Sequence, residues 1–275
     1  MSEDKIFGKY QSAASTLPLE RYREMKENLL VISPHPDDDV LGAGGTMALA
    51  SEGGRGVFAV YVTDGGGSPQ KEPRTTPEAM AARREREALA SLRAIGAAGG
   101  FFLRHQSRDL GEGASGEVRE ELTQILQLLK PAEVYLPAPY ERHRTHQLCT
   151  GLTLDALRSA GDWPLRAYGY SLWGSFWGGK ARIARDIGPV IRKKVEAVTA
   201  HASQIEYRNY HQGILGKNNY EAVFMESHEI QKVSFVEIFL DMTEFLFRKD
   251  LSLKTFMRED FDKFQSAFTD FPMES

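Results

Sequence analysis

One imidazole and three carboxylates follow a short apolar run near the start of the chain. His35 lies between two prolines, and Asp37, Asp38 and Asp39 come directly after it in SPHPDDDVLGAGGTM. A catalytic zinc takes three protein ligands from imidazole and carboxylate groups and keeps a further position for water. A neighbouring carboxylate that is not a ligand can take a proton as general base. This stretch therefore predicts two metal ligands and a base on one turn.

A second pair of imidazoles, His143 and His146, lies three residues apart in ERHRTHQL. One of them would complete a set of three zinc ligands with His35 and Asp38. Each motif also has an ordinary structural explanation. An aspartate-rich turn is often solvated, and two histidines at this spacing can cap a helix or lie on the surface. The combination of the two motifs favours a metal hydrolase.

The elements between these motifs alternate between strand and helix patterns. Strands are expected within 28–33, 55–63, 100–105 and 131–138, and helices within 44–54, 77–97, 115–130 and 144–159. Such alternation with short connections predicts a Rossmann-like, mostly parallel sheet. Ligands of such sheets bind at the carboxyl ends of the strands. His35, Asp64 and His143 each follow a predicted strand, so three junctions bring acids and imidazoles to one edge.

The second half of the chain has a less regular pattern. We expect strand character within 166–179, one helix over 190–219, and a strand followed by a helix within 232–250. Three aromatic residues can stack on a sugar face, although core packing explains them as well: Trp173, Phe176 and Trp177. Five phenylalanines near helical spacing predict core or oligomer contacts: Phe256, Phe261, Phe264, Phe268 and Phe271.

Composition limits the classes of function. The chain has 275 residues, of which 41% are hydrophobic, and fits a single α/β domain over 1–275. Within it, 28–150 holds the motifs, and 165–275 is expected to complete the pocket. The net charge is −4 without a basic stripe, which disfavours nucleic acid as a partner. The glycines of GAGGT do not form a dinucleotide fingerprint.

Cellular location is expected to be cytoplasmic. Cys149 is the only cysteine, so no internal disulfide forms. The N-terminal residues lack the apolar segment of a signal peptide, and no apolar run approaches the ~20 residues that span a bilayer.

Taken together, these motifs resemble the LmbE-like, or PIG-L, superfamily. SPHPDDDVLGAGGTM is similar to the family's first signature, and RHRTHQL to its second histidine motif. Weaker similarity continues through VYVTDGGGS, RREREALASLRAIG and KKVEAVTAHASQ and covers most of 28–240. The resemblance implies a Rossmann-like fold and a zinc-dependent deacetylase of substrates that contain N-acetylglucosamine.

The family's functional residues transfer by position. His35, Asp38 and His146 correspond to the zinc ligands, and Asp37 to the general base. His143 corresponds to the histidine that stabilises the oxyanion as an imidazolium. These roles are what the resemblance implies.

Further positions either match the family or depart from it. Arg84 corresponds to an arginine that contacts substrate, although an ion pair on the helix explains it equally well. Asp39 stands in place of a glutamate, and Thr145 in place of an aspartate that would support the charge of the neighbouring histidine. We expect Asp39, Thr145 and Asp64 to support the ligands from behind. Asp109 is the nearest match to an aspartate after the third strand.

The predicted function is zinc-dependent removal of an N-acetyl group from an N-acetylglucosamine-type amino sugar or its conjugate. Three alternatives stay open: a zinc amidase that acts on a larger acyl or thiol conjugate, a non-catalytic metal- or sugar-binding protein, and a nucleotide-binding Rossmann protein. The predicted partner is a small acetylated sugar or glycoconjugate. A homo-oligomer is also expected, with contacts through the C-terminal aromatic residues.

Overall fold

A computed structural model of the chain describes residues 3–11, 25, 27–70, 75–111, 113–173, 182–224 and 233–248. Phe176, Trp177 and the phenylalanines of the C-terminal stripe lie outside this part. The expected oligomer contact and two of the three expected sugar-stacking aromatics therefore stay predictions.

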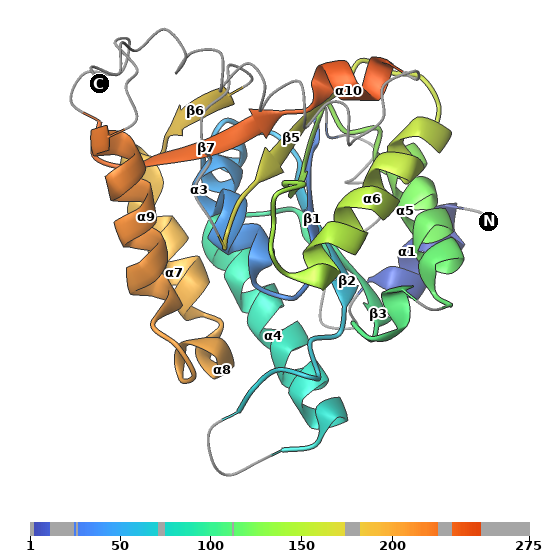
Figure 1. The fold of residues 1–275 in the computed structure, drawn as a ribbon, viewed down its shortest axis with the longest axis horizontal. Helices are drawn as coiled ribbons and strands as arrows, with labels where there is room; N and C mark the ends of the chain where they lie inside the picture. Colours follow the sequence, from blue (N-terminus) through green and yellow to red (C-terminus); the bar gives the residue numbers. More distant parts are fainter. Residues whose placement is uncertain are drawn as a thin grey trace, which may run out of the picture.

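The centre of the molecule is a sheet of seven strands in the order β3-β2-β1-β4-β5-β7-β6 (Figure 1). The strands are β1 (Leu29–Ser33), β2 (Val57–Thr63), β3 (Gly99–His105), β4 (Glu133–Pro137), β5 (Arg166–Tyr170), β6 (Arg182–Asp186) and β7 (Val236–Asp241). The first five are parallel to one another, while β7 pairs antiparallel with both β5 and β6. The predicted mostly parallel α/β sheet is confirmed.

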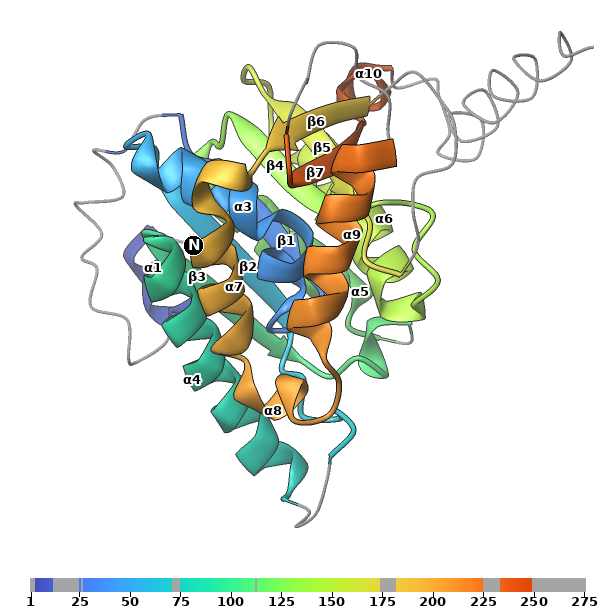
Figure 2. The ribbon, with the colours of Figure 1, turned by 90° about the vertical axis from the view of Figure 1, so that its left-hand side faces the viewer.

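Helices cover both faces of the sheet and complete three layers (Figure 2). One face carries α3 (Asp38–Glu52), α4 (Pro77–Ile95), α7 (Ile191–Thr199), α8 (Ala202–Ile205) and α9 (Tyr210–Phe224). The other carries α1 (Glu3–Tyr10), α5 (Ser115–Leu129), α6 (Arg144–Ser159) and α10 (Thr243–Phe247). Two short 3₁₀ turns, η1 (Asp109–Gly111) and η2 (Gly188–Val190), complete the described elements.

Strand β1 shows why both faces must be covered. Successive side chains of a strand point to opposite faces. Leu30 and Ile32 pack into the core beneath α5 and α6, while Leu29 and Val31 pack into the core beneath α3 and α4. All four side chains are fully buried. A continuous apolar run is therefore the expected sequence of a central parallel strand.

The topology fixes where a ligand can bind. From β1 the chain proceeds outward through β2 to β3, and from β4 it proceeds in the opposite direction to β5. The order of strands therefore reverses between β1 and β4, and their carboxyl ends leave a crevice between the loops that follow them. Residues 34–37 follow β1, and residues 138–143 follow β4.

Helix α3 begins at Asp38, earlier than the predicted start at Gly44, so the aspartates form its first turn. The glycines of GAGGT lie inside this helix, and at two of them neighbouring side chains leave no room for a larger residue. A Cβ at Gly42 would overlap the ring of Tyr170, and one at Gly45 would overlap Ile187. The glycine-rich segment is thus a packing surface of the helix.

The prediction of one helix over 190–219 is wrong, because this segment forms α7, α8 and α9. Helix α7 ends at Thr199, and the carboxylate of Glu87 on α4 holds the start of α8 by hydrogen bonds. Glu87 accepts hydrogen bonds from the backbone N–H of Ser203 at 2.9 Å and from its hydroxyl at 2.6 Å. Strand β6 was not predicted. Its sequence RIARD is charged and partly exposed at the edge of the sheet, so it lacks an apolar pattern.

Candidate metal and catalytic site

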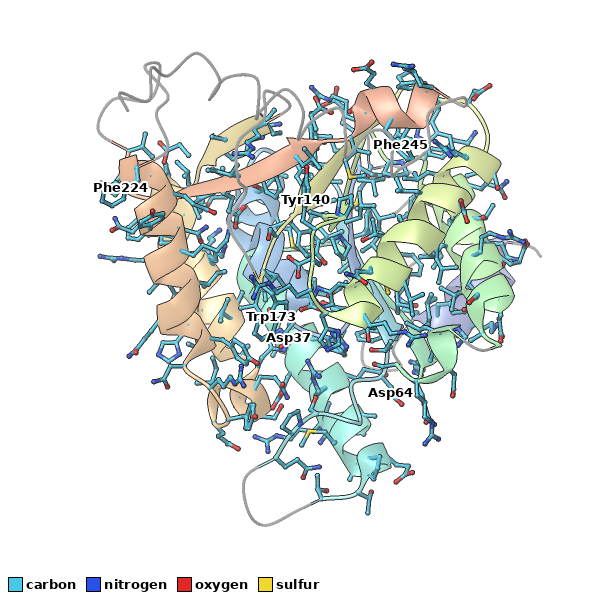
Figure 3. The ribbon with its side chains drawn as sticks, in the orientation of Figure 1. Asp37, Asp64, Tyr140, Trp173, Phe224 and Phe245 are labelled. Carbon is cyan, nitrogen blue, oxygen red and sulfur yellow. The ribbon has the colours of Figure 1, made fainter. Side chains whose placement is uncertain are left out.

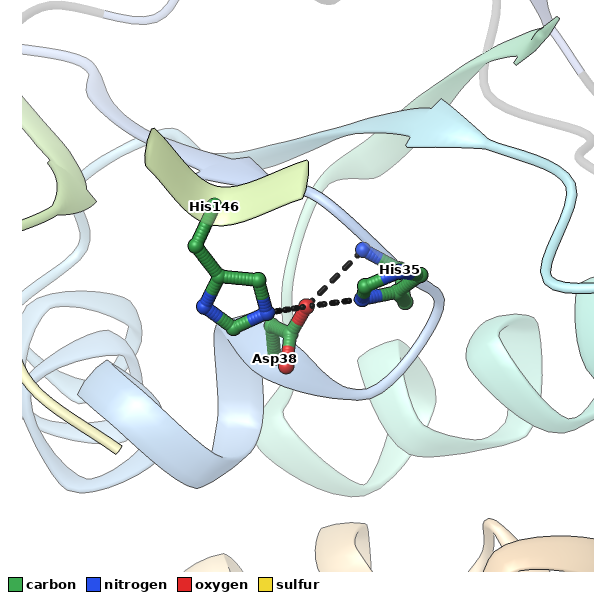
Figure 4. A group of neighbouring side chains, drawn as sticks. All are labelled: His35, Asp38 and His146. Atoms are coloured by element: carbon green, nitrogen blue, oxygen red, sulfur yellow. Dashed lines mark hydrogen bonds and ion pairs between the residues drawn. The ribbon is translucent and has the colours of Figure 1, made fainter. Parts of the chain in front are cut away.

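Three of the predicted residues meet at the carboxyl ends of β1 and β4. His35 lies on the turn after β1, Asp38 begins α3, and His146 lies in the first turn of α6. Asp38 Oδ2 is 2.9 Å from His35 Nδ1 and 3.2 Å from His146 Nε2 (Figure 4). One ligand atom from each residue lies within 4.8 Å of the others.

The chemistry of this cluster fits a divalent cation. Two imidazole nitrogens and one carboxylate oxygen around a common point are the donor set of a catalytic zinc site. Burial by itself raises the pKa of Asp38, but His146 and His35 hold it well below its usual value. Burial lowers the pKa of His146, yet Asp38 and Glu141 outweigh burial and raise it to about 10. A bound cation would replace the protons that the cluster otherwise holds.

The turn that carries His35 is fixed by its own sequence and by the neighbouring strand. Two prolines restrict its backbone on either side of His35. The Ser33 hydroxyl donates to the His35 carbonyl at 2.6 Å, and the Thr63 hydroxyl donates to the Pro34 carbonyl at 2.7 Å. The N–H groups of Asp37 and Asp38 also donate to the His35 carbonyl.

Asp37 lies beside the three converging residues and is ion-paired with Arg84 of α4. Arg84 Nη2 is 2.7 Å from Asp37 Oδ1 and also donates to the Pro36 carbonyl at 3.3 Å. Burial raises the pKa of Asp37, Arg84 opposes that rise, and Asp38 adds to it. Gly65 makes room for the guanidinium, because a Cβ there would lie 2.6 Å from Arg84 Nη1.

His143 faces the cluster from the start of α6. Its ring lies edge-on to His35 and tilted against His146, with centroids 5.1 Å apart in both pairs. Burial lowers the pKa of His143, and the charges of His35 and His146 lower it further. Thr145 is buried in the same turn of α6.

Asp39 and Asp64, both expected behind the ligands, have different surroundings. Asp39 is fully buried, and its Oδ2 accepts a hydrogen bond from the Tyr61 hydroxyl at 2.7 Å. Burial raises its pKa to about 7. Its backbone N–H donates to Ser33, which in turn holds the His35 carbonyl. Asp64 Oδ1 instead accepts the N–H of Gly66 at 2.8 Å, so that its carboxylate shapes the glycine turn after β2.

Sequence reasoning missed Glu141, which lies two residues before His143. Its side chain is fully buried, and Oε2 lies 3.2 Å from His146 Nδ1. The only signal in the sequence is an acid next to the second histidine motif. The imidazole of His201 is buried, and neither of its ring nitrogens has a hydrogen-bond partner among the described residues.

A cavity of about 580 Å³ opens beside the cluster. Asp37, His143 and Arg84 line it, and Trp173 forms part of its wall. Asp37 and Trp173 are labelled in Figure 3. The Trp173 side chain is partly exposed and lies edge-on to Tyr210, with 6.3 Å between ring centroids. Further lining comes from Ser68, Ser107, Gln204, Arg208, Asn209 and Lys217.

No helix in the described ranges combines the length and the apolar character that crossing a bilayer requires. This finding agrees with the composition and leaves the cellular location a prediction.

Two comparisons with known proteins find similarity to proteins named de-N-acetylase or deacetylase. The family model described as PIG-L, GlcNAc-PI de-N-acetylase, matches residues 30–157. The chain is 28% identical over 201 residues to diacetylchitobiose deacetylase of Thermococcus kodakarensis, a match that covers 67% of this chain and 72% of the relative.

Two solved structures share the fold. N,N'-diacetylchitobiose deacetylase of Pyrococcus horikoshii superimposes with a TM-score of 0.67 at 23% identity, over 90% of this chain and 96% of the other. GalB, the 4-carboxy-2-hydroxymuconate hydratase of Pseudomonas putida KT2440, gives 0.64 at 21% identity, over 78% and 95% of the two chains. At this level of identity the likeness concerns the fold, which carries more than one reaction.

Proposed function

Because this chain belongs to the PIG-L (LmbE-like) family, we propose that it is a metal-dependent hydrolase that removes an N-acetyl group from an N-acetylglucosamine-type amino sugar or its conjugate. The observation that carries the proposal is the meeting of His35, Asp38 and His146 in the lining of a cavity, with Asp37 and His143 beside them. The deacetylase from Thermococcus kodakarensis supports the class of substrate.

His35, Asp38 and His146 are the residues that would hold the metal, through the atoms that face one another, His35 Nδ1, Asp38 Oδ2 and His146 Nε2. Two nitrogen ligands and one oxygen ligand favour zinc. When bound, zinc supplies a Lewis acid that polarises a carbonyl group and lowers the pKa of water. Asp38 and His146 are almost completely buried, which limits competition from solvent for these ligand atoms.

Asp37 is the proposed general base. Arg84 binds Oδ1, so Oδ2 is the atom proposed to take the proton from the attacking water. As the amide C–N bond breaks, protonated Asp37 would return that proton to the leaving amine nitrogen. The raised pKa of Asp37 suits this exchange, because a base must also release its proton within the same cycle.

His143 is the proposed donor to the acetyl oxygen. Negative charge develops on this oxygen as water adds to the carbonyl carbon, and a fixed N–H donor stabilises it. The ring of His143 lines the cavity next to His35 and His146, where an acetyl group in reach of Asp37 would lie.

The cavity also bears on the rest of the substrate. Trp173 offers a partly exposed indole at its wall, and aromatic rings of this kind pack against the apolar face of a sugar. Arg208 and Lys217 lie on the lining as well, so the cavity has space and polar groups for more than an acetamido group. This favours a disaccharide or a sugar conjugate as substrate.

The test is release of a free amine from N-acetylglucosamine and from diacetylchitobiose. Purified protein is assayed as isolated, after removal of metal by a chelator, and after zinc is restored. We expect release that is lost with the metal and recovered with zinc, and lost in Asp37→Asn at full zinc occupancy. Amine release that persists without metal would contradict a metal-dependent reaction. No release from either sugar by zinc-loaded protein would contradict the proposed substrate class.

A further inference from the structure

Glu141 is a buried carboxylate whose two oxygens bind different parts of the site. It lies on the loop between β4 and α6, and its own backbone is fixed at both ends. Its N–H donates to the Ala138 carbonyl at 3.1 Å, and its carbonyl accepts from Gln147 Nε2 at 2.7 Å. The side chain therefore has little freedom to move, and its contacts are set by the fold.

The first oxygen, Oε2, faces His146. It lies 3.2 Å from Nδ1, while the Nε2 atom of the same ring points to Asp38. A carboxylate at Nδ1 accepts a hydrogen bond from the N–H of that nitrogen, which keeps the proton on Nδ1 and leaves the Nε2 lone pair free. A histidine that binds a metal through Nε2 needs this tautomer, and such partners also fix the orientation of the ring.

The second oxygen, Oε1, holds the chain that follows β5. It accepts the backbone N–H of Leu172 at 2.6 Å and lies 3.4 Å from that of Trp173. Both residues line the cavity, and the Trp173 ring packs edge-on against Tyr210. One carboxylate thus joins a proposed metal ligand to the wall of the cavity where substrate is proposed to bind.

We infer that Glu141 is a positioning residue that orients His146 for metal binding and at the same time fixes the Trp173 wall of the cavity. The inference rests on the proposed function for the identity of His146 as a ligand. Under this inference, one side chain holds both the metal ligand His146 and the Trp173 wall in place for the same substrate. Its charge is the property that matters, because it makes Nδ1 the protonated nitrogen of His146 and accepts two backbone N–H groups.

The first measurement is zinc affinity of metal-free protein, in competition with a chelator of known affinity. Glu141→Gln keeps the size of the side chain but presents an amide to His146 and removes the charge. We expect zinc to bind about 10- to 100-fold more weakly, the usual effect of losing a partner behind a ligand. Glu121→Gln is the matched control. Glu121 is also buried and lies 2.6 Å from a histidine, His105 Nε2, but on the β3–α5 side of the fold.

A second variant separates charge from packing. Glu141→Asp keeps the charge but shortens the side chain, whereas Glu141→Gln keeps the volume. Positioning through charge predicts tighter zinc binding by Glu141→Asp than by Glu141→Gln. A purely packing role predicts the reverse order. This variant also provides the affinity test if Glu141→Gln fails to fold.

The second measurement follows Trp173 without metal or substrate. In a background with Trp163→Phe and Trp177→Phe, Trp173 is the only tryptophan. Quenching of its fluorescence by acrylamide should increase in Glu141→Gln and stay at the parent value in Glu121→Gln. Zinc affinity and quenching that are the same in the two glutamine variants would overturn the inference.

These readouts differ from the test of the proposed function because neither requires turnover. If zinc affinity and quenching change as expected but no sugar is deacetylated, the role of Glu141 stands and the proposed substrate fails. If parent protein binds no zinc, the ligand assignment fails, and so does the inferred role of Glu141 at His146.

Discussion

Arg84 and Asp37 form a buried ion pair, with 2.7 Å between Nη2 and Oδ1, that joins helix α4 to the start of helix α3. The guanidinium side chain is only 3% exposed and the carboxylate 11%. Burial disfavours the charged form of Asp37 and raises its pKa, and the charge of Arg84 opposes part of this rise. Arg84 is therefore ion-paired, which is one of the two explanations offered by the sequence. It also lines the cavity, and the other explanation, contact with substrate, stays a prediction.

Removal of the Arg84 charge should shift the acid limb of the kcat/KM profile. A base works only when deprotonated, and loss of a neighbouring cation raises the pKa of Asp37. Arg84→Gln should therefore move the acid limb to higher pH, by about 1–3 units. The measurement is a pair of pH–rate profiles at saturating zinc. Arg83→Gln is the control, because Arg83 is adjacent but pairs with Glu87 and Glu206. An unchanged acid limb in Arg84→Gln would mean that Asp37 is not the base.

The two adjacent aspartates should respond differently to the same substitution. Asp38→Asn replaces a proposed ligand with a neutral amide and should lose most bound zinc. Asp37→Asn should keep its zinc and lose roughly a hundredfold or more in rate, the scale of a general base. Elemental analysis and the amine-release assay on both proteins give the comparison. Metal loss in Asp37→Asn combined with full metal in Asp38→Asn would exchange the two roles.

Much of this site could be predicted because strand ends are readable in a parallel sheet. The apolar run before His35 and the strand before His143 place both histidines at one edge. Glu141 could not be found in this way. An acid in a loop is usually solvated, and only the packing of residues 171–173 against it shows that it is buried.

The second half of the fold shows the same limit. Lys193 and Lys194 look alike in IRKKVEAVT, yet Lys194 is fully buried and Lys193 is partly exposed. Lys194 Nζ donates to Glu237 Oε1 at 2.6 Å, and Glu237 also accepts the N–H groups of Gly45 and Thr46. Glu237 lies 43 positions from Lys194 and 192 positions from Gly45 along the chain, so no local pattern reveals the pair.

The Lys194–Glu237 pair should contribute strongly to stability. Lys194→Met leaves a buried carboxylate without its cation, which costs about 3–5 kcal/mol in free energy of unfolding. Lys193→Met removes a solvent-exposed pair with Glu52 and should cost about 0–1 kcal/mol. Urea unfolding of the two variants tests this difference. Equal midpoints would show that Glu237 is satisfied by α3 alone.

His201 should make stability depend on pH in a defined window. Burial lowers its pKa in the folded protein to about 3. In the unfolded chain its pKa is about 6.5, so between these values only the unfolded state binds the proton. The free energy of unfolding should therefore decrease as pH falls from about 6.5 to 3, by up to about 1.4 kcal/mol per pH unit.

The measurement compares how steeply the free energy of unfolding falls with pH, between about pH 6.5 and pH 3, in parent protein and in a variant without this imidazole. His201→Asn removes the titrating group, and its free energy of unfolding should decline less steeply than that of parent protein below pH ~6.5. The variant is expected to be less stable at neutral pH because it leaves a small cavity, so the slope and not the absolute value is compared. Parallel slopes would mean that the imidazole is protonated in the folded state or reaches solvent.

Thr145 provides the last prediction, which concerns the alkaline limb of the reaction. The proposed donor His143 must be protonated to stabilise the oxyanion. Its pKa is lowered by burial and by His35 and His146, and a threonine at 145 cannot supply the charge that would oppose this. The alkaline limb of kcat/KM should therefore begin to fall near neutrality or below it.

Thr145→Asp should move this limb to higher pH, because a carboxylate beside His143 favours the imidazolium. The rate at pH ~8 should rise as well, provided that zinc content stays equal in the two proteins, since more of the donor is then protonated. Thr145→Asn, which is similar in size but neutral, controls for the change of side chain. If all three alkaline limbs superimpose, the residue at 145 is not coupled to the proton of His143. Asp38 and Glu141, whose charges already oppose the fall in the pKa of His143, would then be the carboxylates that act on it.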